Sequence, residues 1–136
     1  MNGMANLFIG LLKTKFKTLP PVEHVSLQGK TVIVTGGNDG IGFEVAKQLA
    51  AFGPKEMILA SRNIVKTETA IQAIRKATGD TELSLKAWFL DMADFETVKQ
   101  LAERANKDLD GLDILVLNAG AIRPAFVLSK DGYEEV

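Results

Sequence analysis

The 136-residue chain contains no cysteine and a single histidine, and its formal net charge is −1. Without cysteine, disulfides and thiolate metal sites are excluded, and the composition fits a reducing compartment, so we expect a cytoplasmic protein. The near-neutral charge indicates no nucleic-acid partner. His24 precedes the first predicted strand and lacks the partners that a metal site or catalytic triad needs, so the sequence predicts no metal site.

Long hydrophobic runs are also lacking. No stretch approaches the roughly 18–20 apolar residues of a transmembrane helix. The apolar segment 7–12 comes before the three lysines of segment 13–17, the reverse of a secretory signal. Residues 1–26 are predicted to be an N-terminal arm and linker. Its apolar residues can share one helix face, and we favour packing on the protein or on a second subunit of a homo-oligomer over contact with a membrane surface.

The remaining residues, 27–136, alternate strand and helix patterns. Strands are expected at 31–35, 56–61, 83–90 and 114–117, and helices at 41–52, 64–78 and 95–109. This order predicts an α/β fold, a Rossmann-type doubly wound parallel sheet with strand order 3-2-1-4 and helices on both faces. The expected apolar anchors of the helices are Val45, Leu49 and Phe52, then Ile71 and Ile74, then Phe95, Val98, Leu101, Ala102 and Ala105.

The fourth predicted strand, 114–117, is apolar at every position and therefore reads as buried on both faces. Within this sequence no further strand follows to cover its outer side. An apolar strand at a bare sheet edge is an aggregation hazard. The fold is therefore expected to need more chain or a partner at this edge.

Glycines crowd the turn after the first predicted strand, which reads Thr35-Gly36-Gly37-Asn38-Asp39-Gly40-Ile41-Gly42. Glycine permits positive φ and close approach of a ligand, and a helix start offers free N–H groups and the positive end of a dipole. A strand, this turn, a helix and a second strand predict a pyrophosphate site. A P-loop is excluded, because no Lys-Ser/Thr pair follows the glycines. The predicted contacts are Gly36, Asn38, Asp39, Gly40, Ile41 and Gly42.

Two motifs in register resemble those of the classical short-chain dehydrogenase/reductase family. Residues 35–42 match its T-G-x-x-x-G-[IL]-G motif, and residues 118–120 match its N-A-G motif. The resemblance covers 27–136 and implies an NAD(P)-binding Rossmann domain of an oxidoreductase, which passes hydride between nicotinamide and a ketone or secondary alcohol. Three stretches look like the retinol-dehydrogenase-like branch: 29–34, 90–93 and 131–134.

The end of the second predicted strand favours NADP over NAD. NAD sites place an acid about 20 residues after the glycines, where this chain has Arg62 and Asn63. Arg62 can pair with a 2′-phosphate and stack on adenine, and Lys66 can add a second cation. Asp39 argues the other way, because a carboxylate repels a nearby phosphate. The alternative is that Arg62 and Lys66 are solvated residues at a helix start.

The family resemblance implies further cofactor contacts. Asp91 would hold the adenine amino group, and Met92 would contribute backbone. The alternative is that Asp91 caps a helix that begins near residue 93, and both roles can hold together. Asn118 would contact the ribose and steady the sheet, while Ala119 and Gly120 would let the backbone approach the cofactor.

No catalytic residue can be assigned. The family uses a tyrosine, a lysine four positions later and a serine, all well beyond N-A-G. Tyr133 is the single tyrosine, and its i+4 position lies past residue 136. We therefore expect the N-terminal portion of a longer oxidoreductase with a small-molecule carbonyl or alcohol substrate. The alternatives are a non-catalytic nucleotide-binding or interaction module, and a decayed product that folds poorly.

Overall fold

The computed structural model describes residues 23, 25–122 and 124–135. Almost all of the predicted N-terminal arm, including its proposed helix face and His24, lies outside these residues. The elements are β1 (Thr31–Thr35), α2 (Gly40–Ala51), β2 (Glu56–Ser61), α3 (Ile64–Thr78), β3 (Ser84–Phe89), α4 (Phe95–Asp108) and β4 (Ile114–Val116). No helix of the described part of the chain has the length and apolar character to cross a membrane.

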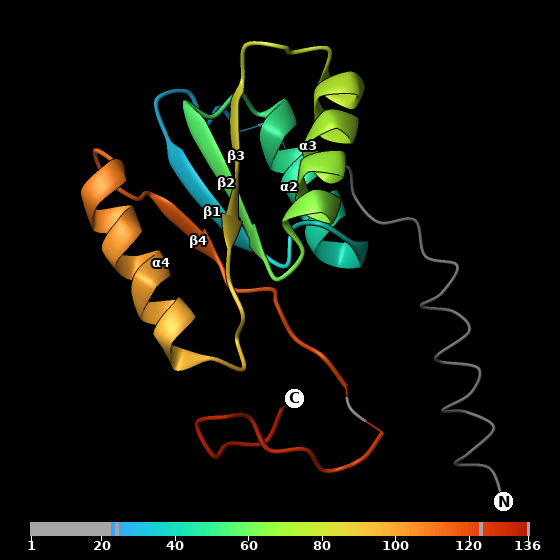
Figure 1. The fold of residues 1–136 in the computed structure, drawn as a ribbon. Coiled ribbons are helices and arrows are strands. Elements are labelled where there is room, and N and C mark those ends of the chain that lie inside the picture. Colours follow the sequence, from blue (N-terminus) through green and yellow to red (C-terminus); the bar gives the residue numbers. More distant parts are fainter. Residues whose placement is uncertain (1–22, 24, 123, 136) are drawn as a thin grey trace, which may run out of the picture.

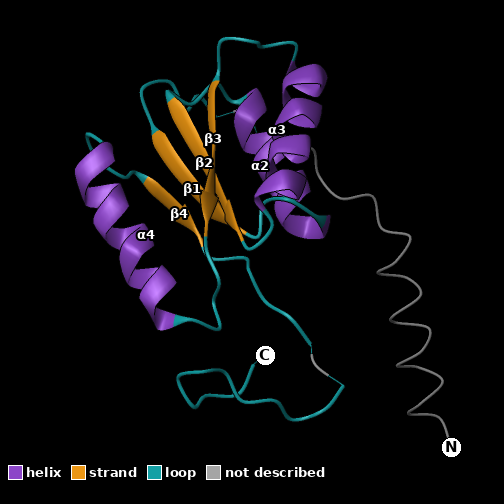
Figure 2. Cartoon of the chain, viewed as in Figure 1, coloured by secondary structure: helices purple, strands orange, loops and turns teal. Residues whose placement is uncertain are grey.

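The strands form one parallel sheet in the order β3-β2-β1-β4. Helices α2 and α3 cover one face, and α4 lies on the other (Figure 1). Figure 2 shows the loops that leave the carboxyl ends of the strands gathered at one end of the sheet. The predicted Rossmann-type architecture and strand order are confirmed.

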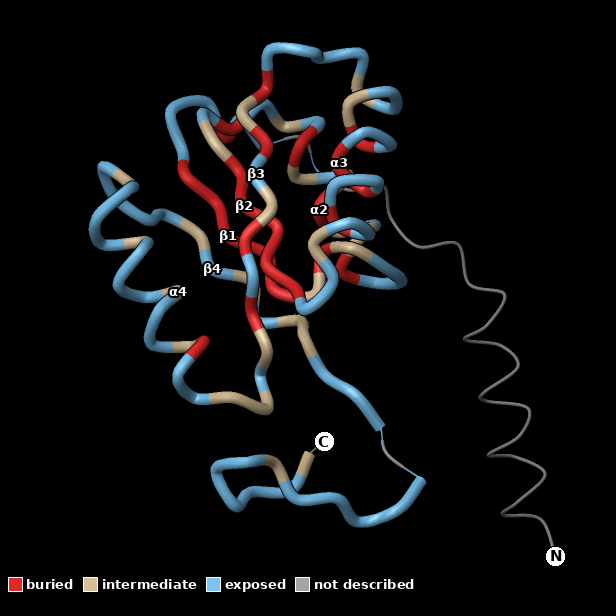
Figure 3. The backbone as a smooth tube through the Cα atoms, viewed as in Figure 1, coloured by how far each residue is buried: buried red, intermediate tan, exposed pale blue. Residues whose placement is uncertain are grey.

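Successive side chains of the central strands point to opposite faces of the sheet, so the hydrophobic core has two parts, one on each face. Val32 and Val34 of β1 join the cluster under α2 and α3, whereas Ile33 joins the cluster under α4 with Trp88. All three β1 residues are at most 1 % exposed. Figure 3 shows this burial concentrated in β1 and β2. Two-sided burial is the pattern of a parallel sheet with helices on both faces.

Helix α2 meets the sheet through small residues, which corrects the predicted anchors. Its buried residues are Gly42, Ala46 and Ala50, spaced four apart on one face. The larger Leu49 and Phe52 pack partly against the cluster beside them. Small side chains let the helix axis approach the strands closely, so the residues with the largest apolar surface flank the contact.

Helix α3 follows its prediction residue for residue. Asn63 caps its start by accepting the Lys66 N–H at 2.9 Å, and Gly79 caps its end in the left-handed region at φ 70°. Ile71 and Ile74 are buried, as predicted. In α4 the predicted anchors Val98, Leu101 and Ala105 are partly buried over the core, as is Leu109 just after the helix. The predicted anchors Phe95 and Ala102 are wrong, because both are exposed.

The prediction that the fourth strand is buried on both faces is wrong. Ile114 and Val116 pack on the cluster under α2 and α3, but Leu115 is 48 % exposed and Leu117, just after the strand, is 75 % exposed. Leu115 pairs with Ile33 and shares its face, where α4 covers the central strands and leaves β4 open. Within the described residues, β4 pairs with β1 alone, so the bare edge is as predicted.

We expect this edge to drive self-association of the 136-residue chain, because exposed apolar strands pair with one another. Leu117→Lys should shift the chain toward monomer in light scattering at micromolar concentration. Val65→Lys is the matched control, since Val65 is also 75 % exposed but lies on α3. An equal shift in both variants would mean that added charge, rather than the edge, controls association.

Candidate functional site

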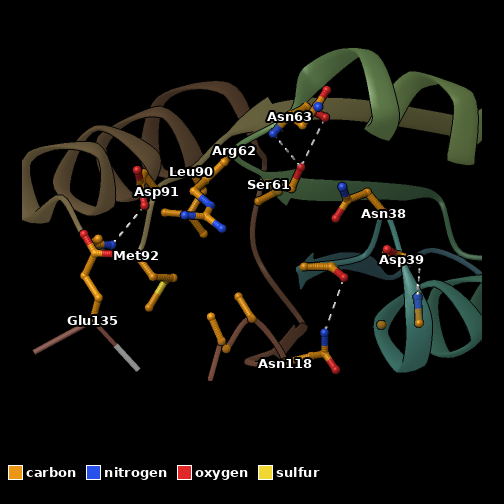
Figure 4. A pocket seen from close by; sticks show the side chains of 18 of the residues that line it. Asn38, Asp39, Ser61, Arg62, Asn63, Leu90, Asp91, Met92, Asn118 and Glu135 are labelled. Atoms are coloured by element: carbon orange, nitrogen blue, oxygen red, sulfur yellow. Dashed lines mark hydrogen bonds between the residues drawn. The ribbon is translucent and has the colours of Figure 1, made fainter. Parts of the chain in front are cut away.

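A cavity of about 680 Å³ opens at the carboxyl ends of the strands. Figure 4 shows its wall assembled from the loops after β1, β2, β3 and β4. Because the strands are parallel, these loops lie together at the carboxyl end of the sheet, which is the usual ligand position in such folds. All residues predicted for the cofactor site line this cavity: Gly36, Asn38, Asp39, Gly40, Ile41, Gly42, Arg62, Asn63, Lys66, Asp91, Met92, Asn118, Ala119 and Gly120.

The glycines of the turn after β1 have different physical roles. A Cβ on Gly42 would lie 2.3 Å from the Gly36 carbonyl oxygen, and one on Gly37 would lie 2.4 Å from Leu59 Cδ2. These two glycines permit close packing within the protein. Gly40 has φ +50°, and a Cβ added there would meet nothing within 4 Å, so space remains beside its backbone. The expectation of ligand approach therefore fits Gly40 better than Gly37 or Gly42.

The start of α2 presents backbone donors. Asp39 caps the helix by accepting the Gly40 N–H at 2.9 Å, and the Phe43 N–H donates to the Asp39 carbonyl at 3.1 Å. The N–H groups of Ile41 and Gly42 have no partner among the described residues. Unsatisfied N–H groups at the positive end of a helix suit an anionic ligand.

Thr35 does not line the cavity but holds two residues that do, a role that the sequence analysis did not single out. Its hydroxyl oxygen accepts the N–H groups of Asn118 and Ala119, each at 3.0 Å, and donates to the Val116 carbonyl at 3.3 Å. Asn118 Nδ2 in turn donates to the Thr35 carbonyl at 3.1 Å and to that of Gly36 at 3.4 Å. These contacts join the ends of β1 and β4. The available signal was the position of Thr35 at the start of the glycine motif.

The basic residues after β2 have unlike environments. The Arg62 side chain points into the cavity (Figure 4) and has no partner among the described residues. Lys66 Nζ instead lies 2.5 Å from Asp39 Oδ2. This bond is the main cause that lowers the pKa of the Asp39 carboxyl, followed by the Gly40 N–H. The repulsive charge expected from Asp39 is therefore partly neutralised within the protein.

Asp91 follows β3 and is not a helix cap. Its Oδ1 accepts the Ala93 N–H at 3.0 Å, and the cap of α4 is Asp94, whose carboxylate accepts the Glu96 N–H at 2.9 Å. The capping alternative for Asp91 is wrong, because α4 starts at Phe95 rather than near residue 93. The Thr97 hydroxyl donates to the Asp91 carbonyl at 2.8 Å and so holds this turn against α4.

A turn formed by residues 127–135 supplies a wall that the sequence analysis missed. Ser129, Tyr133, Glu134 and Glu135 line the cavity from this segment. The segment attaches to the start of α4, where Asp131 accepts the Phe95 N–H at 2.8 Å and the Tyr133 ring lies 5.1 Å from the Phe95 ring. Tyr133 thus packs on α4, and no local sequence pattern signals this contact, because Phe95 and Tyr133 lie far apart in the chain.

Comparisons with known proteins agree with this geometry. The family model described as short chain dehydrogenase matches residues 30–135. Short chain dehydrogenase sol3 of Alternaria solani is 40 % identical over 99 % of this chain and 46 % of its own length. Short-chain dehydrogenase fogG of Aspergillus ruber is 40 % identical over 98 % of this chain and 38 % of its own length. The chain thus spans less than half the length of these curated relatives.

Solved structures share the fold. Menthone neomenthol reductase from Mentha piperita is 38 % identical, with a TM-score of 0.62 over 69 % of this chain and 32 % of that one. L-Sorbose reductase from Gluconobacter frateurii, complexed with NADPH and L-sorbose, is 27 % identical, with a TM-score of 0.63 over 73 % of this chain and 36 % of that one. Because the family model matches residues 30–135 of the 136-residue chain, this chain belongs to the short chain dehydrogenase family.

Proposed function

We propose that this chain forms the NADP(H)-binding part of an oxidoreductase that interconverts a ketone and a secondary alcohol. The observation that carries the proposal is the cavity at the carboxyl ends of the strands, framed by the glycine turn and the starts of α2 and α3. When bound, the cofactor supplies a hydride acceptor or donor at its nicotinamide ring. The residues of this chain bind and orient the cofactor, and none is assigned to proton transfer.

The pyrophosphate fits the start of α2. The N–H groups of Ile41 and Gly42 lack partners among the described residues and lie at the positive end of a 12-residue helix. Gly40 leaves open space where a side chain would project. Asn118, Ala119 and Gly120 form the facing wall, and the Thr35 hydroxyl holds the first two of them in place.

The adenosine half of NADP(H) fits the cavity wall at the carboxyl ends of β2 and β3. Arg62 is a cation that no described residue neutralises, and a guanidinium suits both a 2′-phosphate and the face of adenine. Asp91 offers a carboxylate as acceptor for the adenine amino group, with Met92 beside it on the wall. Asn63 and Lys66 complete this end. The absence of an acid after β2 supports NADP over NAD.

Arg62→Met is expected to weaken NADPH binding about tenfold or more, since a charge-assisted contact to phosphate contributes roughly 1.5–3 kcal/mol. NADH binding should change little, because NADH lacks the 2′-phosphate. Titration of cofactor fluorescence measures both affinities. Lys76→Met, which removes an exposed cation from the far part of α3, is the control. Equal losses for NADPH and NADH would contradict a 2′-phosphate role for Arg62.

A second candidate function is a non-catalytic nucleotide-binding or interaction module. The observation that favours it is the open edge of β4 with the exposed Leu115 and Leu117 beside it. A partner strand paired there would satisfy the edge and cover this surface. A chain of this length that binds NADPH, pairs with a partner and lacks carbonyl reduction in the complex would support the module over the oxidoreductase.

A further inference from the structure

An ion pair links the loop after β1 to the first turn of α3 at the proposed adenosine end of the cavity. Asp39 Oδ1 accepts the Gly40 N–H at 2.9 Å, while its Oδ2 lies 2.5 Å from Lys66 Nζ. Asp39 therefore caps α2 with one oxygen and holds a lysine of α3 with the other. Both side chains remain at least half exposed, so a ligand in the cavity can reach them.

The charges at the start of α3 are unusual for a helix start. Arg62 precedes the cap, Lys66 lies in the first turn, and that turn contains no acidic residue. Cations are unfavourable at the positive end of a helix, which normally attracts anions. Asp39 reaches in from another loop and compensates one of them. Arg62 has no partner among the described residues, so positive charge remains here for an anion.

Other acids around the cavity do not take this place. Asp91, Glu134 and Glu135 enter its wall from the end of β3 and from the 127–135 turn. In the described part of the chain, Lys66 forms its ion pair with Asp39. Asp39 is thus the carboxylate with which a bound 2′-phosphate would compete for the lysine.

We propose that the Asp39–Lys66 ion pair sets the cofactor preference, because Asp39 and the 2′-phosphate of NADP(H) compete for Lys66. The inference rests on the proposed NADP(H) site. Binding of the phosphate draws the lysine from the carboxylate, and the lost ion pair offsets part of the gain. Asp39 thereby lowers the preference for NADPH over NADH below what Arg62 and Lys66 alone would produce.

The first test is Asp39→Asn, which keeps an oxygen to cap α2 and removes the charge. Adenosine 2′,5′-bisphosphate, titrated by calorimetry, should bind about three- to tenfold more tightly, as expected for removal of one nearby charge. NADH affinity should be unchanged. Glu44→Gln is the matched control, because Glu44 also lies near the start of α2 but pairs with Lys47 at 2.6 Å and is absent from the cavity wall. A purely structural ion pair predicts weaker binding instead, and that result would overturn the proposal.

The second test repeats Asp39→Asn in a Lys66→Met background. Competition for the lysine predicts that the gain falls to less than about twofold there, since coupled residues are non-additive. An equal gain in both backgrounds would reduce Asp39 to a distant repulsive charge and overturn the proposal. If the unchanged chain binds neither NADPH nor the bisphosphate, the NADP(H) site itself fails. If it binds both and Asp39→Asn has no effect, the ion-pair inference alone fails.

Discussion

Gly42→Ala is expected to lower the free energy of unfolding by about 3 kcal/mol, the upper range for overpacking in a tight core. The added Cβ would lie 2.3 Å from the Gly36 carbonyl oxygen and 2.3 Å from Asn118 Nδ2. Backbone atoms of a tight turn cannot yield as a flexible side chain does. Alanine favours a helix over glycine by roughly 1 kcal/mol, which opposes the loss but does not outweigh it. Urea unfolding followed by circular dichroism measures the change.

Cofactor binding should fall together with stability, because the same clash displaces the start of α2 from the end of β4. Gly111→Ala serves as the control, since a Cβ there meets nothing within 4 Å. It should leave both stability and NADPH affinity near their original values. Retention of the original unfolding midpoint by Gly42→Ala would show that α2 does not sit this close to the glycine turn.

Thr35→Val is expected to cost about 2–4 kcal/mol, because a buried donor or acceptor left without a partner costs roughly 1–3 kcal/mol. Valine matches threonine in shape but leaves the N–H groups of Asn118 and Ala119 and the Val116 carbonyl without their present partner. Thr35 is 2 % exposed, so water cannot replace the hydroxyl without rearrangement. The expected sign is a lower unfolding midpoint and faster hydrogen exchange at residues 118 and 119.

Thr31→Val tests the same chemistry at the other end of β1. Thr31 is 5 % exposed, and its hydroxyl has no hydrogen-bond partner in the described part of the chain. This variant should keep or slightly raise stability, since valine buries a methyl group in place of the hydroxyl. Equal losses in the two variants would mean that threonine in β1 matters for strand geometry rather than for the contact with β4.

The sequence alone was enough for the element order and for the part of the cavity wall that follows β1, β2, β3 and β4, but not for the wall formed by residues 127–135. Apolar β-branched runs at 31–35 and 56–61 with helical patterns between them indicate parallel strands, and the loops after parallel strands share one edge. The boundaries shifted by at most a few residues, as at β3, where Leu83 and Leu90 are buried but lie outside the strand. Such ends depend on hydrogen bonds that no local pattern specifies.

The sequence by itself thus determined the sheet, its strand order and the loops after the strands that line the cavity, because local periodicity and connection handedness leave few topologies. The tertiary structure decided which of those residues contact one another. Two of these contacts join positions far apart in the chain: the Asp39–Lys66 ion pair and the hydrogen bond between Thr35 and Asn118. The exposure of Leu115 likewise depends on a helix elsewhere in the chain, because α4 does not cover β4. Such contacts and exposures follow from the packing of the helices on the sheet, and the local sequence around each residue does not determine them.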